Sequence, residues 1–140
     1  MKKTLIVAPE AGGHCPFYLS LIAEAFTHEN CKILAPEKDR EVRYHLEQRD
    51  MNLASFEFIK PSGKQPDAIL KQVKELVTEN QFKTVFFAYF DNHIAYLLKH
   101  KVSLGCSVTG IWFHPYALDA HYRWLPPVDK RIRTRGGIHR

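Results

Sequence analysis

Short apolar runs alternate with longer amphipathic segments along most of this chain, and this alternation constrains its fold more than any other feature. Strands are expected at Thr4–Ala8, Cys31–Ala35, Ser55–Ile59, Thr84–Ala88 and Ser107–Phe113. Helices are expected between them, at residues 16–28, 38–48, 67–79 and 92–101. Strands that alternate with helices at this spacing form βαβ units. The sequence therefore predicts an α/β fold, with an open, mainly parallel, five-stranded sheet of the Rossmann-like type and helices on both faces.

The alternation stops after Tyr116, which divides the chain into two parts. Residues 1–116 are expected to form one Rossmann-like domain, a reasonable size for a single hydrophobic core. Residues 117–140 have no apolar period and contain Pro126-Pro127 and Gly136-Gly137. They are expected to be a basic tail, or the start of a linker to a missing domain.

The positive charge of the chain is concentrated in its last 20 residues. Residues 121–140 contain six Lys and Arg against Asp129 alone, whereas the first 120 residues contain 14 basic and 14 acidic side chains. A domain without net charge offers no basic surface, so nucleic acid is not an expected partner. Aromatic residues interleaved with arginines in the tail favour an anionic membrane surface instead.

The sequence lacks two features that would place the protein in or beyond a membrane. No apolar run approaches the ~20 residues that span a bilayer. The basic start, Met1-Lys2-Lys3, is followed by too few apolar residues for a secretory signal. We expect a cytoplasmic protein, with peripheral attachment at the inner face of the membrane.

Three His-bearing segments each follow directly on an expected strand. They are Glu10-Ala11-Gly12-Gly13-His14, Phe90-Asp91-Asn92-His93 and Trp112-Phe113-His114-Pro115-Tyr116. In an open parallel sheet, ligands bind beyond the carboxyl ends of the strands, where the strand order reverses. These segments therefore predict a ligand-binding or catalytic role for at least one of the histidines.

The Gly12-Gly13 pair lets a ligand approach the backbone closely, and the helix that follows favours an anion at its start. A phosphate, a diphosphate or a sugar hydroxyl would each fit. The loop matches neither the GxGxxG dinucleotide motif nor the P-loop. A tight turn with a solvated histidine is the alternative. Ser62-Gly63-Lys64 is interpreted only as a turn that carries a lysine.

With the usual strand order 3-2-1-4-5, His14 is expected to face Asp91 and His93. A carboxylate beside an imidazole orients it and raises its basicity, as a general base requires. The catalytic candidates are thus His14, Asp91 and His93, and the ligand-binding candidates are Gly12, Gly13, His114 and Tyr116. The simpler interpretation of Asp91 is a helix cap, and both roles are compatible.

The three cysteines form no CxxC pair and no zinc motif. Cys31 and Cys106 are expected to be buried, reduced thiols. Cys15 follows His14 at the start of a helix, where thiol pKa values fall, so a nucleophilic role is a minor alternative. The histidines lack the close spacing typical of metal ligands, and no metal site is predicted.

The segments around Gly12-Gly13-His14, Phe90-Asp91-Asn92-His93 and Gly110–Tyr116, with the Tyr18–Ile22 helix, resemble the N-terminal Rossmann-like domain of GT-B-type glycosyltransferases. The resemblance spans about residues 3–120. It implies that the glycine loop approaches the donor's phosphate and sugar, and that Asp91 or His93 supplies a base or positions the acceptor. No metal ion is required in this family, and no cofactor is expected beyond a sugar nucleotide as donor substrate.

The resemblance also implies that this chain lacks the C-terminal domain that holds the sugar nucleotide. We therefore expect the acceptor-binding half of a glycosyltransferase of polysaccharide biosynthesis, inactive on its own. Its expected partners are a glycan or lipid-linked acceptor and a missing domain or partner subunit. The alternative is a stand-alone flavodoxin-like module that binds a phosphorylated small molecule.

Overall fold

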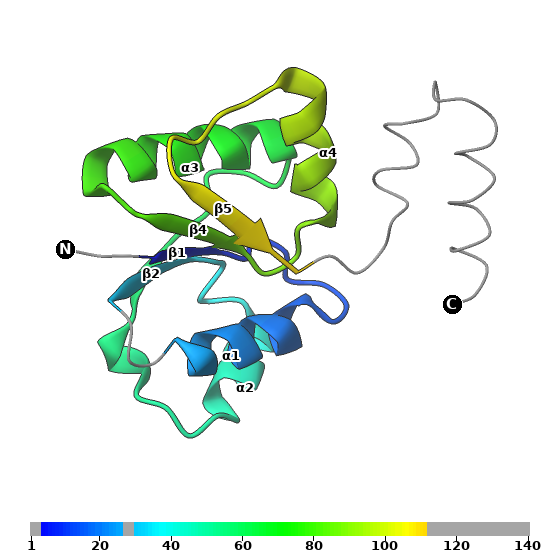
Figure 1. Cartoon of the computed structure of the whole chain (residues 1–140). Coiled ribbons are helices and arrows are strands. Elements are labelled where there is room, and N and C mark those ends of the chain that lie inside the picture. Colours follow the sequence, from blue (N-terminus) through cyan, green and yellow to red (C-terminus); the bar gives the residue numbers. More distant parts are fainter. Residues whose placement is uncertain (1–3, 27–29, 112–140) are drawn as a thin grey trace.

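The computed structural model describes residues 4–26 and 30–111, which form an open sheet of five strands, all of them parallel (Figure 1). The strands are β1 (Thr4–Val7), β2 (Cys31–Leu34), β3 (Glu57–Ile59), β4 (Thr84–Phe87) and β5 (Ser107–Gly110). Their order is β3-β2-β1-β4-β5, as predicted. The order reverses between β1 and β4, which lie side by side with Thr4 opposite Thr84.

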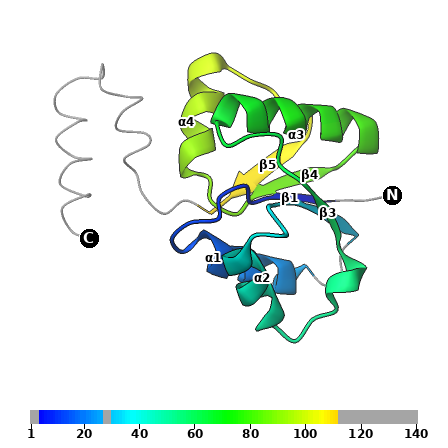
Figure 2. The same ribbon diagram turned by 180° about the vertical axis from the view of Figure 1, so that it is seen from behind.

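Four α-helices cover the two faces of the sheet. Helices α1 (Cys15–Ala25) and α2 (Arg40–Glu47) lie on one face, and α3 (Pro66–Asn80) and α4 (Asp91–His100) lie on the other (Figures 1 and 2). A short 3₁₀ helix, η1 (Leu53–Ser55), precedes β3. The predicted Rossmann-like α/β fold is therefore confirmed for the part of the chain that the structure describes.

Each face of the sheet has its own hydrophobic core. The β1 strand is buried along its whole length, and its side chains alternate between the two cores. On one face Ile6 packs with residues of α1 and α2, including Val42 and Leu46. On the other face Leu5 and Val7 pack with the apolar side of α3. A central strand buried on both faces explains why Thr4–Val7 has no polar alternation.

Several element boundaries differ from the predicted ones for identifiable reasons. The strands β1, β2 and β4 each end one residue early, although the backbone N–H groups of Ala8, Ala35 and Ala88 still donate to neighbouring strands. The β3 strand begins at Glu57 because the Asn52 side chain accepts from the N–H of Ala54 and caps η1.

One predicted helix face and one predicted helix cap also differ from the structure. Ala25 was expected on the apolar stripe of α1 but is exposed, since Leu19, Ile22 and Ala23 form the buried face. Asp91 is the first residue of α4, with Phe90 at the cap position, so its predicted role as the cap of that helix is wrong. Predicted strand residues Trp112 and Phe113 lie outside the described residues.

Candidate functional site

The loop from Ala8 to His14 leaves the carboxyl end of β1 at the switch point of the sheet. Gly12 and Gly13 are exposed, and a Cβ atom added to either would meet nothing within 4 Å. Gly13 has a φ of 60°, a left-handed conformation that glycine adopts without strain. The open space above this backbone is room that a ligand could occupy.

His14 closes this loop and lies at the N-cap of α1. Its side chain is exposed and makes no capping hydrogen bond, while its carbonyl oxygen accepts from the N–H of Tyr18. The ring also lies edge-on to the ring of Tyr18. His14 is therefore available to a ligand above the loop.

Glu10 and His93 join the loop after β1 to the first turn of α4. The Nε2 atom of His93 lies 3.3 Å from Oε1 of Glu10. The His93 side chain is 1% exposed and the Glu10 side chain 22% exposed. The Glu10 side chain is thus partly exposed, and the imidazole lies beneath it, with the ring of Phe87 packed against the imidazole.

This pair leaves two buried polar atoms without a partner among the described residues. They are Oε2 of Glu10 and Nδ1 of His93. Buried polar atoms are almost always hydrogen-bonded, so an unsatisfied pair at a sheet edge is a reason to expect a ligand or water there. The Oε2 atom of Glu10 is a hydrogen-bond acceptor, and it could accept a hydrogen bond from a hydroxyl group.

Further acidic and ionisable groups surround the pair. Asp91 is 3% exposed and lies in the first turn of α4, where a negative charge is favourable. Burial raises the pKa of the Tyr89 hydroxyl, and the nearby charges of Asp91, Cys15 and Glu10 raise it further. The part of the edge beyond β1 and β4 therefore carries negative charge and disfavours any additional anion in direct contact with these groups.

Cys15 illustrates that effect. Burial, followed by the charge of Glu10, raises the pKa of its thiol to about 11, and Asp91 adds to the increase. Its own backbone hydrogen bond acts in the opposite direction, but more weakly than either burial or Glu10. The lowered pKa expected from the helix start is therefore wrong, and the thiol is a poor nucleophile near neutral pH. Cys106, expected to be buried, is only partly so.

The structure places those predicted site residues that it describes at one edge of the sheet, and it pairs His93 with a residue outside the predicted set. Gly12, Gly13 and His14 lie in the open loop, while Asp91 and His93 are buried beside it. The contact partner of His93 is Glu10, which the predicted catalytic set omits. His114 and Tyr116 lie outside the described residues.

A carboxylate directly after a buried strand was the signal that could have identified Glu10.

Within residues 4–26 and 30–111, no group of three or more His, Cys, Asp or Glu side chains is arranged to hold a metal ion. Among the helices that the structure describes, none is both long and apolar enough to cross a membrane.

The chain matches no protein-family model, and no curated protein sequence is significantly similar to it. The candidate site therefore rests on its own geometry.

Proposed function

We propose that this chain is the N-terminal, acceptor-binding half of a sugar-nucleotide-dependent glycosyltransferase, completed by a C-terminal donor-binding domain or a partner subunit. The observation that carries the proposal is the Glu10–His93 pair beside the open Gly12-Gly13 loop at the switch point. The fold supports it, because an open parallel sheet binds ligands at this edge.

The acceptor in this proposal is a hydroxyl-bearing glycan that lies over the loop. Its O–H donates to the unsatisfied Oε2 atom of Glu10, the acceptor identified above. In the transfer step the acceptor oxygen forms a bond to the anomeric carbon while the bond from that carbon to the diphosphate breaks. The acceptor proton passes to a base at the edge, and the nucleoside diphosphate leaves with the bonding electrons.

Two groups from the same loop can receive that proton. His14 is exposed, and its ring makes no hydrogen bond to any other described residue that would have to be broken first. Glu10 is held by His93, which acts as a positioning residue because it is buried below the carboxylate. Asp91 adds negative charge that favours proton transfer toward the protein.

We also propose that the protein works in the cytoplasm at the inner face of the membrane, in polysaccharide biosynthesis with a lipid-linked acceptor. Support comes from the sequence of residues 121–140, whose net charge of +5 and interleaved aromatic residues suit an anionic surface.

An NMR titration of the ¹⁵N-labelled chain tests the acceptor assignment. The probes are methyl glycosides of glucose, galactose, mannose and N-acetylglucosamine, and separately UDP-glucose and GDP-mannose. A glycoside should shift the amide signals of residues 10–14 and 91–93 in a saturable way. Gly12→Val should abolish this shift by filling the open space, whereas Thr78→Val on the exposed side of α3 should not. Tight binding of a sugar nucleotide with no response to any glycoside would overturn the proposal.

A further inference from the structure

A pocket lies along the same edge of the sheet, over the carboxyl ends of β2 and β3. It is a pocket of about 530 Å³, formed where the loops after β1, β2 and β3 meet. Pro9 is part of its wall, so the pocket adjoins the loop that carries Glu10. Its volume is within the range of about 300–1,000 Å³ that small-molecule sites occupy.

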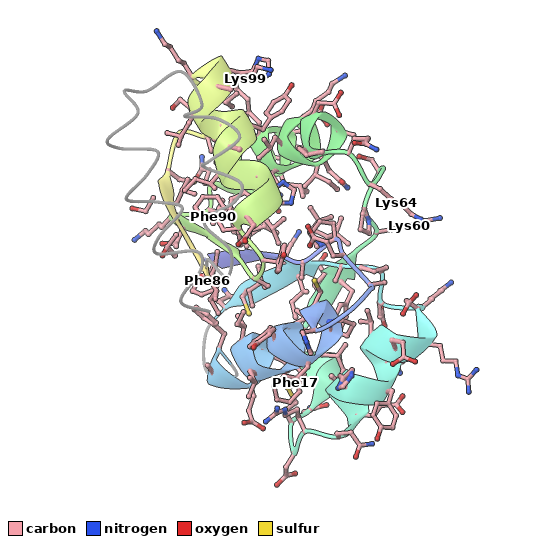
Figure 3. The ribbon with its side chains drawn as sticks, turned by 90° about the vertical axis from the view of Figure 1, so that its right-hand side faces the viewer. Phe17, Lys60, Lys64, Phe86, Phe90 and Lys99 are labelled. Atoms are coloured by element: carbon pink, nitrogen blue, oxygen red, sulfur yellow. The ribbon has the colours of Figure 1, made fainter. Side chains whose placement is uncertain are left out.

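Three lysines line this pocket. Lys38 comes from the loop after β2, and Lys60 and Lys64 come from the loop after β3. Figure 3 views the carboxyl edge of the sheet and shows Lys60 and Lys64 close together, across the edge from Phe90. Within the part of the chain that the structure describes, none of the three lies within ion-pair distance of a carboxylate.

The two carboxylates in the pocket wall are already engaged. Oε1 of Glu37 lies 3.2 Å from Nη1 of Arg43. The Asp39 side chain accepts from the N–H groups of Glu41 and Val42, at 2.9 and 3.2 Å, and so caps α2. Arg43 balances the charge of Glu37, and the three lysines outweigh the remaining carboxylate of Asp39, so the pocket favours an anion.

Apart from Ser62, the rest of the wall is apolar or glycine. Pro36, Phe58, Ile59 and Pro61 line it together with Pro9. A ligand that fills the pocket therefore needs a compact body that packs on proline and aromatic surfaces, as well as an anionic group. Inorganic phosphate would satisfy the lysines but would leave most of this wall uncovered.

We propose that this pocket binds a phosphorylated small molecule of about the size of a sugar phosphate. Its phosphate group contacts Lys60 and Lys64, with Lys38 from the loop after β2 adding positive charge, and its ring packs against Pro36 and Phe58. Hydrogen bonds from ammonium groups to phosphate are charge-assisted and stronger than neutral ones. The inference does not depend on the glycosyltransferase proposal, which places its acceptor above Gly12 and Gly13.

The test is isothermal titration calorimetry of the full chain with glucose 1-phosphate, inorganic phosphate and glucose, with ¹⁵N amide shifts to locate binding. We expect saturable binding of glucose 1-phosphate, weaker binding of phosphate and none of glucose, with shifts confined to residues 35–39 and 58–64. The double variant Lys60→Gln/Lys64→Gln should lose about tenfold or more in affinity, since hydrogen bonds to charged groups contribute about 1.5–3 kcal/mol.

The matched control is Lys74→Gln/Lys99→Gln, which removes the same charge from exposed positions on α3 and α4. Lys99 lies far from Lys60 and Lys64 in Figure 3. The control should bind glucose 1-phosphate as the unmodified chain does. Equal weakening of both double variants, binding of glucose as tight as that of its phosphate, or no saturable binding would overturn the proposal.

A final experiment distinguishes a free phosphate ester from a lipid headgroup as the ligand of this pocket. Vesicles of phosphatidylcholine with and without phosphatidic acid are sedimented with the unmodified chain and with Lys60→Gln/Lys64→Gln. Equal sedimentation of the two proteins supports the small-molecule assignment. The small-molecule assignment would be overturned if Lys60→Gln/Lys64→Gln reduced binding to phosphatidic acid vesicles and the unmodified chain did not bind glucose 1-phosphate.

Discussion

His93 holds Glu10 across 83 positions of sequence, with Nε2 of the imidazole 3.3 Å from Oε1 of the carboxylate. The contact joins the loop after β1 to the start of α4, the two segments that flank the switch point of the sheet. Removing either partner should therefore affect both stability and the shape of the proposed site.

His93→Ala should lower the free energy of unfolding by about 2–4 kcal/mol, because it empties a buried position and removes the partner of Glu10. Glu10→Gln should cost less than about 1 kcal/mol, since the amide keeps a hydrogen-bonding group and the side chain is partly exposed. Urea denaturation of His93→Ala, of Glu10→Ala, which removes the carboxylate altogether, and of the double variant gives the coupling, expected at about 0.5–3 kcal/mol. Additive effects would mean that the two side chains do not interact in solution.

Cys15 should react slowly with iodoacetamide at pH 7.5, and its rate should rise with pH toward the thiol pKa of about 11. Glu10→Gln should speed the reaction at fixed pH, because the negative charge of Glu10 helps to raise that pKa. Peptide mass spectrometry resolves Cys15 from the other cysteines. The control is Glu41→Gln on α2, and equal acceleration by both variants would remove Glu10 as the cause.

The same thiol predicts a loss of stability at high pH. Its pKa in the folded chain, about 11, lies above the ordinary value of 9.0, so the folded state favours the protonated thiol. That contribution is complete below pH 9 and is lost as the pH rises through 11. Thermal unfolding of the chain and of Cys15→Ser between pH 8 and pH 11 should show a smaller decline for the variant.

His14→Ala tests the exposed base of the proposed transferase. In an enzyme completed by its donor-binding domain, this variant should lower kcat by ~10²–10⁴. The free energy of unfolding should change by less than about 0.5 kcal/mol, because the ring is exposed. His100→Ala, at the exposed end of α4, is the control. A kcat near that of the unmodified enzyme would leave His14 as a turn residue only.

The two loop glycines should respond differently to alanine. Gly13→Ala should cost about 1–2 kcal/mol, because a φ of 60° strains any residue with a Cβ atom. Gly12→Ala has open space and no such φ, so the free energy of unfolding should stay nearly constant. Denaturant titrations distinguish the two, and equal costs would show that the loop rearranges.

The basic segment at residues 121–140 should bind anionic vesicles reversibly, since each basic residue near such a surface contributes about 1 kcal/mol. Co-sedimentation compares the full chain with a version that ends at Ala120. Binding should require anionic lipid, disappear in the shortened version and weaken with added salt. Binding that is indifferent to lipid charge would leave the segment without this role.

The sequence was sufficient to predict the sheet because its strands are short apolar runs, of which β1 is buried on both faces. Each of the runs Thr4–Val7 and Thr84–Phe87 is apolar after its first residue, and helical segments separate the successive strands. The strand order was predicted from the usual topology of such folds. That order led to the expectation that His14 and His93 lie at the same carboxyl edge of the sheet.

The detail of the site was not predictable, because it depends on which side chains meet across loops. Glu10 and His14 belong to one short segment, yet Glu10 turns inward to His93 and His14 remains in solvent. The helix start at Cys15 predicts a lowered thiol pKa, but burial and the Glu10 charge outweigh it. The lysine pocket forms only where three loops converge, so Lys64 alone indicated no more than a turn.

The position of β1 at the centre of the sheet also governs how the chain is built during synthesis. Of the five strands, β1 leaves the ribosome first. The β2 strand can then pair with β1, and β3 with β2, while the later residues are synthesised. The other edge of β1 stays open until β4 arrives, some 80 residues after β1. Because synthesis proceeds at about 5–20 residues per second, the unpaired edge of β1 persists for seconds in the nascent chain.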